Sequence, residues 1–291
     1  HVERVVFNEI TKKAVIHGIE NPRQIEPLLV DAYMARRALD YLVGFNISPI
    51  LWTKLPGSKS AGRVQSVALK LITKREHEIE LFNPEEFWTL SIQFNDGDKN
   101  SLLASITQLN DKKIEKFSFK NKGEINKAMD VVKSKKFQIN DISSKVVNRN
   151  PSGPFTTSTL QQVSSGRLGY GASRTMQIAQ KLYQGIEIDG ETIGLITYMR
   201  TDGTNLSTDA IDTFRKYIKT EFGEEYVPEN PASYSGKKAK NAQEAHEAIR
   251  PTDIMRAPDT IKKYLSPDQH KLYDLIWSRA LSSQMKPAQF D

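Results

Sequence analysis

The spacing of apolar residues changes twice along this chain of 291 residues. Over residues 1–80, apolar side chains recur at intervals of three and four, as they do on one face of an amphipathic helix. From residue 82 to about residue 150, several runs alternate apolar and polar side chains, which is typical of half-buried strands. The helical period returns after residue 155. We therefore predict a multidomain protein, mainly α with a smaller β-rich part.

Turn and capping residues indicate where these elements begin and end. Ser60 is a candidate N-cap for a helix that runs to residue 80, and Gly18 is a plausible helix stop. The glycine-rich run 166–173 follows no predicted strand, so a turn between two helices is favoured over a phosphate-binding loop. Strands are predicted over residues 85–94 and 136–147. The predicted helices span residues 7–18, 25–45, 58–80, 122–134, 156–169, 172–184, 207–223 and 266–285.

Composition narrows the class of protein only moderately. A hydrophobic fraction of 38% and a charged fraction of 26% fit a globular chain, and the length suggests more than one domain. No apolar run approaches the roughly 18 residues that a membrane span needs, so no membrane partner is expected. The absence of cysteine excludes disulfides within this span and is compatible with the cytosol. A net charge of +6 favours polyanionic partners.

An apolar run breaks into a polar turn at residues 194–207, GLITYMRTDGTNLS. If residues 195–200 are extended, Tyr198 and Arg200 point to the same side, with Asp202 two positions further on. A phenol with a pKa of about 10 is a poor nucleophile until a nearby cation or base favours its anion. Arg200 could supply that cation and could stabilise charge on a phosphoryl oxygen. A core tyrosine beside a surface arginine is the structural alternative.

Two basic groups in the first helical region also allow two interpretations. Lys59 and Arg63 flank small residues at a helix start, which favours phosphate, although an ordinary capped helix explains them equally well. Arg36, Arg37 and Asp40 lie within about one helical turn. An Arg36–Asp40 ion pair is the simplest expectation for them. A fixed arginine could instead present its planar fork to a phosphate or a base edge.

The sequence predicts no metal site within these residues. His246 lies in the polar run AQEAHEAIRPTD, which is not the HExxH pattern of a zinc site. A single histidine of this kind is usually structural. Its dense polar surroundings nevertheless keep it as a candidate for chemistry.

Taken together, these stretches resemble the bacterial type IA DNA topoisomerases, of the topoisomerase I kind. The similar segments occur in the family's order and cover most of the chain. They are RVVFNEIT, ARRALDYLVGF, SAGRVQSVALKLI, NPEEFW, PFTTSTLQQVSSGRLGYGASRTMQIAQKLY, ITYMRTDGTNLS and AQEAHEAIRPTD. Topoisomerase III and reverse gyrase share much of this core, and topoisomerase III remains an alternative within the family.

The resemblance implies roles for individual residues. Tyr198 matches the active-site tyrosine, which attacks one DNA strand and becomes linked to the 5′-phosphate. Arg200 matches an arginine that positions or neutralises the scissile phosphate, and His246 matches a histidine near the active site. Where the family often has tyrosine, this chain has Phe45, which keeps an aromatic face for a base but loses the hydroxyl. The DNA-binding positions expected from the resemblance are Arg36, Arg37, Asp40, Phe45, Ser60, Arg63, Gln65 and Asp202.

The resemblance also implies an architecture, the family's toroidal core in incomplete form. Residues 1–81 would belong to the helical domain that grips single-stranded DNA. Residues 82–157 would form the first part of a β-rich arch, and residues 158–286 the helical domain that carries Tyr198. Residues 287–291 would begin the return into the arch.

The family's cofactor and partners follow from the same resemblance. Its Mg²⁺ is held by carboxylates of a Toprim domain that is not among these residues, so this chain is expected to bind none and to be inactive alone. Transesterification needs no ATP, because the phosphotyrosine bond stores the energy of the phosphodiester. The expected partners are single-stranded and negatively supercoiled DNA in the bacterial cytoplasm and nucleoid, bound by a monomer.

Three rival functions remain, and one of them, a structural or protein-binding domain, does not explain the shared order of the motifs. A non-catalytic DNA-binding module predicts that Tyr198 is dispensable. A tyrosine recombinase pairs a His-x-x-Arg motif with a downstream tyrosine, whereas here His246 and Arg250 are four residues apart and Tyr198 lies upstream.

Overall fold

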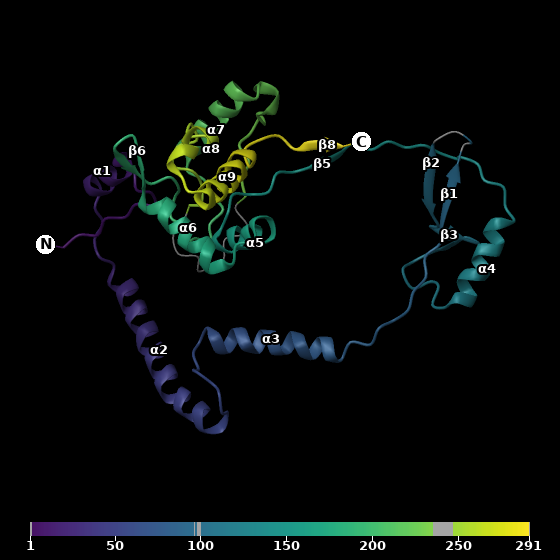
Figure 1. Cartoon of the computed structure of the whole chain (residues 1–291), viewed down its shortest axis with the longest axis horizontal. Helices are drawn as coiled ribbons and strands as arrows, with labels where there is room; N and C mark the ends of the chain where they lie inside the picture. Colours follow the sequence, from purple (N-terminus) through teal and green to yellow (C-terminus); the bar gives the residue numbers. More distant parts are fainter. Residues whose placement is uncertain (1, 96, 98–99, 235–246, 291) are drawn as a thin grey trace. The chain divides into compact units, whose positions relative to one another are not determined.

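The computed structural model describes residues 2–95, 97, 100–234 and 247–290. These residues divide into two compact units (Figure 1). The first unit consists of His1–Glu26 and Ser144–Asp291, and the second unit consists of Pro27–Ser143. The described residues are mainly helical, and their strands form two-stranded antiparallel sheets. The predicted fold class is confirmed, whereas the division into three domains stays a prediction.

The second unit begins with two long helices and continues with short strands and one more helix. Strands β1 and β2 pair antiparallel, with Ser91 opposite Ser105 and Asn95 opposite Ser101. A small core of Phe119, Ile125 and Ala128 joins the last helix to the strands. The elements are α2 (Pro27–Lys54), α3 (Gln65–Glu80), β1 (Ser91–Asn95), β2 (Ser101–Ser105), β3 (Gln108–Leu109), β4 (Lys112–Lys113) and α4 (Lys122–Lys133).

The link between α2 and α3 differs from the sequence prediction. Helix α3 begins at Gln65 rather than near Ser60, and the residue before it, Val64, has no side-chain acceptor to cap it. Residues 58–64 are instead held against α2 by side chains. The Ser48 hydroxyl accepts the Ala61 N–H at 3.1 Å, and a bidentate ion pair follows at Arg63. The predicted N-cap is wrong, because tertiary contacts replace the local one.

The first unit holds the larger core. Helices α5, α6 and α9 pack on one another and, with α7 and α8, gather in one group in Figure 1. The elements are α1 (Lys12–Glu20), β5 (Val147–Arg149), α5 (Thr157–Leu168), α6 (Ala172–Gln184), β6 (Ile186–Ile188), β7 (Glu191–Ile193), α7 (Thr208–Glu221), α8 (Pro258–Ile261), α9 (Pro267–Ser282) and β8 (Ala288–Phe290), with 3₁₀ turns η1 (Glu224–Tyr226) and η2 (Lys262–Tyr264).

Capping explains why these helices begin and end where the sequence indicates. Thr156 and Ser266 each form a capping box, at the starts of α5 and α9 respectively. Gly169 ends α5 with φ of 68°, a left-handed conformation that favours glycine. The predicted turn between two helices at residues 166–173 is therefore confirmed. Leu160, Leu182, Leu195, Leu272 and Ile276 fill the core between the helices.

Two other boundaries were predicted wrongly. Residues 136–146 form no strand, and only Val147–Arg149 pair, with Ala288–Phe290. Ile139 and Ile142 are exposed. An alternation of apolar and polar residues forms a strand only where a partner strand is available to pair with it. Helix α1 begins at Lys12, where Thr11 caps it, and it continues through Gly18. No helix among the described residues is long and apolar enough to span a membrane.

Candidate active site

Tyr198 and Arg200 lie on the exposed side of a segment that is otherwise buried. The Tyr198 side chain is 39% exposed, whereas Thr197 is 1% and Met199 0% exposed. Arg200 is exposed and Thr201 buried. Exposure therefore alternates along the segment, with Tyr198 and Arg200 on the exposed side, although the backbone bends at Thr197 and Met199 and forms no more than an isolated bridge at Ile196.

The buried side of this segment is anchored by threonine hydroxyls. The Thr197 hydroxyl donates to the Ala248 carbonyl at 2.7 Å and accepts the Arg250 N–H at 3.0 Å. Downstream, the Thr157 hydroxyl donates to the Met199 carbonyl at 2.7 Å and accepts the Thr201 N–H at 2.8 Å. The backbone is therefore fixed on both sides of Tyr198.

A cluster of charged side chains lies behind the same segment. We call Arg250, Glu9 and Glu247 the Arg250 cluster. The buried guanidinium of Arg250 donates to both carboxylate oxygens of Glu247, at 2.6 and 3.1 Å, and lies 3.1 Å from a Glu9 carboxylate oxygen. Asn8, the neighbour of Glu9, accepts the Tyr198 N–H at 2.8 Å. The cluster thus connects the N-terminal segment and the segment around residue 250 to the backbone of Tyr198.

A second tyrosine packs against Tyr198. The ring of Tyr183, at the end of α6, meets the ring of Tyr198 edge to face, with centroids 5.3 Å apart. Burial raises the pKa of Tyr183, and the charge of a Tyr198 anion raises it further. Tyr183 therefore stays a neutral phenol beside Tyr198 and orients its ring.

Arg200 is available to bind an anion. It makes no hydrogen bond or ion pair with any residue that the structure describes, and it lines two hollows. The smaller, of about 520 Å³, also involves Asp202 and Thr156–Ser158 at the start of α5. The larger, of about 680 Å³, runs along α6. The structure therefore places Arg200 and Asp202 at one hollow, whereas Tyr198, two residues before Arg200, lines neither hollow.

The basic residues of the second unit form a different pair from the expected one. Arg63, not Arg36, holds Asp40, with contacts of 2.5 and 2.9 Å to its two carboxylate oxygens. These hydrogen bonds, followed by the charges of Arg63 and Arg36, hold the pKa of the Asp40 carboxyl below its usual value. The predicted Arg36–Asp40 pair is wrong, because the planar fork of Arg63 fits the carboxylate better than an i, i+4 neighbour does.

The other candidates on α2 and before α3 are largely exposed. Arg36 and Arg37 lie on the surface of α2. Phe45 stacks on Tyr41, with ring centroids 4.4 Å apart and planes inclined by 28°. The Ser60 hydroxyl accepts from the Gln65 side chain at 3.4 Å. Tyr41 was missed by the sequence reasoning, although its spacing of four residues from Phe45 on a helix could have revealed the pair.

His246 lies outside the described residues. Among the residues described, no group of three or more His, Cys, Asp or Glu side chains could hold a metal ion.

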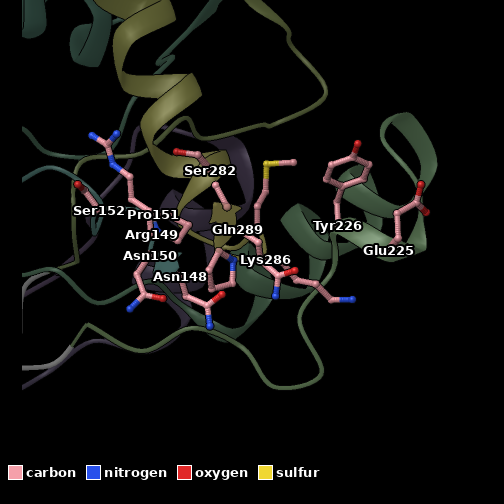
Figure 2. Close-up of a pocket in the computed structure, with 13 residues that line it drawn as sticks. Asn148, Arg149, Asn150, Pro151, Ser152, Glu225, Tyr226, Ser282, Lys286 and Gln289 are labelled. Atoms are coloured by element: carbon pink, nitrogen blue, oxygen red, sulfur yellow. The ribbon is translucent and has the colours of Figure 1, made fainter. Parts of the chain in front are cut away.

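A larger cavity lies away from Tyr198. It measures about 870 Å³ and is lined by residues of β5, η1 and the segment after α9, including Asn148, Arg149, Tyr226 and Lys286 (Figure 2). None of the residues singled out from the sequence lines it. The candidate chemistry is therefore concentrated at Tyr198 rather than in this cavity.

The comparisons with known proteins point to one family. The family model described as DNA topoisomerase matches residues 24–291. The chain is 54% identical over 284 residues to DNA topoisomerase 1 of Rickettsia felis, which covers 98% of this chain and 36% of that protein. It is 50% identical over 290 residues to DNA topoisomerase 1 of Zymomonas mobilis, covering 100% of this chain and 23% of that protein.

A solved structure agrees with these sequence matches. The full-length topoisomerase I from Thermotoga maritima superposes with a TM-score of 0.79 and 41% identity. The match covers 98% of this chain and 44% of that one. The chain thus spans less than half the length of each of these relatives.

Proposed function

The chain belongs to the bacterial DNA topoisomerase I family, and from this premise we propose that Tyr198 is the nucleophile of a type IA DNA topoisomerase. The proposed activity is relaxation of negatively supercoiled DNA in the bacterial cytoplasm, by cleavage of one strand, passage and religation. The observation that carries it is the exposed Tyr198 on a rigidly held backbone, two residues from an arginine with no ion-pair partner among the described residues.

The proposed step is a transesterification. The Tyr198 phenol oxygen attacks phosphorus, a new O–P bond forms, and the bond from phosphorus to the 3′-oxygen breaks. The phenol loses its proton, and the departing 3′-oxygen gains one, so the strand ends in a free 3′-hydroxyl and a 5′-phosphotyrosine. Religation reverses each change. The number of phosphate ester bonds is unchanged, so ATP is not consumed.

Arg200 and the Arg250 cluster have separate roles in this proposal. Arg200 binds a non-bridging oxygen of the scissile phosphate and stabilises the charge that builds there. The Arg250 cluster does not touch the substrate. It positions Tyr198 through Asn8 and Thr197, because in-line attack at phosphorus depends on placing the oxygen correctly. His246 is proposed as a further active-site residue from the resemblance alone.

The second unit is proposed to hold the strand to be cut. Asp40 occupies Nε and one terminal nitrogen of Arg63, which leaves the other terminal nitrogen for a phosphate. Arg36 and Arg37 add charge, and the stacked pair of Tyr41 and Phe45 offers an aromatic face to a base. Ser60 and Gln65 are proposed as polar contacts to the same strand, and Asp202 of the first unit is proposed separately as a DNA contact.

Each step above is assigned to this chain's own residues, and the part of the chain that the structure describes contains no group of three or more His, Cys, Asp or Glu side chains that could hold a metal ion. The resemblance to the family implies that Mg²⁺ is bound by carboxylates of a Toprim domain. The test therefore includes a polypeptide that carries such a domain, and it also tests whether residues 1–291 alone are inactive.

The test is cleavage of an end-labelled single-stranded oligonucleotide by the chain, with and without the Toprim-bearing polypeptide and Mg²⁺. With a 3′ label, the label should migrate with the protein. With a 5′ label, a shorter free oligonucleotide ending in a 3′-hydroxyl should appear. Tyr198→Phe should abolish both products. Tyr183→Phe is the matched control, since it removes the hydroxyl of the neighbouring ring and should leave both products.

The rival functions predict different results. A tyrosine recombinase forms a 3′-phosphotyrosine, so the two labels would exchange their behaviour. A binding module would retain the oligonucleotide without any adduct, even after association of the two polypeptides is verified. A topoisomerase III-type enzyme would form the adduct but would be distinguished by preferring decatenation over relaxation.

A further inference from the structure

Helix α6 exposes a polar stripe that no part of the proposed chemistry uses. We define the α6 stripe as Gln177, Gln180, Lys181 and Gln184, which follow the i, i+3, i+4, i+7 spacing of one helix face. The opposite face of the helix, with Ile178, Ala179 and Leu182, is buried in the core of the first unit. The stripe therefore has no role in packing the core.

The α6 stripe lines the hollow of about 680 Å³ that also contains Arg200 and Arg174. Arg174 is neutralised by Asp268, whose carboxylate lies 2.5 Å away and lines the same hollow. Lys181 and Arg200 have no ion pair with any described residue. The hollow therefore has a net positive charge next to the segment that holds Tyr198.

The side chains of the α6 stripe are also unused as hydrogen-bond donors. The three glutamines and Lys181 make no side-chain hydrogen bond within the described part of the chain. Each glutamine amide offers two donors and an acceptor, and the lysine offers three donors. Amides and cations of this kind make most protein contacts to phosphate and sugar. The helix rises 1.5 Å per residue, so the stripe extends about 10 Å, comparable to three stacked nucleotides.

We propose that the α6 stripe binds the backbone of single-stranded DNA, on the part of the strand that adjoins the phosphate held by Arg200. This inference rests on the proposed function, which assigns the scissile phosphate to Arg200. Arg200 lines the same hollow as the α6 stripe, and this locates the stripe on the neighbouring part of the strand. A nucleic-acid backbone fits the hollow better than a peptide does. The hollow offers cationic and amide donors, and its one carboxylate, that of Asp268, is already paired with Arg174.

The test measures binding of a fluorescent single-stranded oligonucleotide to the Tyr198→Phe chain, so that no cleavage interferes. Lys181→Gln should reduce the slope of log affinity against log salt concentration by about 0.7, the value for one lost phosphate contact on a single strand. The matched control is Lys216→Gln, which removes an exposed lysine from α7 in the same unit and should leave the slope unchanged. The doubly substituted Gln177→Ala, Gln184→Ala chain should bind severalfold more weakly with an unchanged slope.

Each result is decisive for the inference. Equal slopes for Lys181→Gln and Lys216→Gln would overturn it, provided that both variants keep the parent's unfolding midpoint, as exposed positions should. A larger effect of Lys181→Gln on a blunt duplex than on the single strand would also overturn it. Failure of the adduct assay with a persisting slope change would reject the proposed topoisomerase function while the strand-binding site stands. Adduct formation with an unchanged slope would reject the strand-binding site while the proposed topoisomerase function stands.

Discussion

Two hydrogen bonds join Thr197 and Arg250, and each residue donates its backbone N–H in one of them. The Thr197 N–H donates to the Arg250 carbonyl at 2.9 Å, and the Arg250 N–H donates to the Thr197 hydroxyl at 3.0 Å. Thr197 precedes the candidate nucleophile, Tyr198. The Arg250 side chain in turn holds Glu9, whose neighbour Asn8 accepts the Tyr198 N–H. The position of one exposed phenol therefore depends on three segments that are remote in the sequence.

Replacing Thr197 by valine tests the first of these contacts. Thr197→Val keeps the branched shape but leaves the buried Arg250 N–H without its acceptor. We expect the free energy of unfolding to fall by about 1–3 kcal/mol, measured by urea denaturation. The yield of the proposed adduct should fall as well. The control is Thr220→Val, which removes an exposed hydroxyl on α7 and should change stability by no more than about 0.5 kcal/mol.

The Arg250 cluster can be examined by a double-mutant cycle. Arg250→Met leaves the carboxylates of Glu9 and Glu247 without their counter-charge, and we expect a loss of about 3–5 kcal/mol in the free energy of unfolding. Combining it with Glu9→Gln should show a coupling of about 0.5–3 kcal/mol. Zero coupling would show that Glu9 does not help to hold this arginine.

The exposed pair of Lys13 and Asp209 provides the matched comparison, because it too joins the N-terminal segment to a later part of the first unit. Its side chains are 87% and 82% exposed. A cycle on this pair should give a coupling of only about 0–1 kcal/mol. A larger value than that for Glu9 and Arg250 would contradict the assignment of the buried cluster as the main clamp.

Gly194 is required by close packing beside the active-site segment. A Cβ at this position would lie 2.7 Å from the Tyr183 carbonyl oxygen and 3.0 Å from the Ile10 carbonyl oxygen. Gly194→Ala should therefore destabilise the chain by about 1–3 kcal/mol through overpacking, measured as a lower urea midpoint. Gly166→Ala is the control, since nothing lies within 4 Å of its Cβ. That helix position should gain about 0.5–1 kcal/mol.

Asp268 links α9 to α6 and gives the stability a pH dependence. The hydrogen bond from Arg174, followed by that from Tyr170, lowers the pKa of the Asp268 carboxyl. A lowered pKa means that the contribution is present above the usual value of about 3.9 and is lost as the pH falls through the lowered one. The difference in urea midpoint between the parent and Asp268→Asn should therefore shrink below about pH 4.

Arg174→Gln removes the same interaction from the other side and should produce the same change with pH. A difference between parent and Asp268→Asn that stays constant from neutral pH to strongly acidic pH would show that the ion pair contributes nothing to stability. The measurement is a series of urea titrations across that range.

Several elements could be predicted because their signals are local. The starts of α5 and α9 follow from Thr156 and Ser266, whose side chains bond residues only three positions away. The turn at Gly169 follows from a glycine after a helical period. The strand predicted over residues 136–147 failed, because alternation describes one strand, whereas a sheet needs a second one from elsewhere in the chain.

The sequence by itself determined the helical and strand-rich regions, the family resemblance, and the placement of Tyr198 and Arg200 on the same, exposed side of their segment. These features depend on residues that are neighbours along the chain. Only the tertiary structure decided that Arg63 rather than Arg36 binds Asp40, and that Glu9 and Arg250 support Tyr198. Charged side chains choose partners by geometry in three dimensions, and the buried Arg250 also by desolvation, so sequence spacing does not identify those partners.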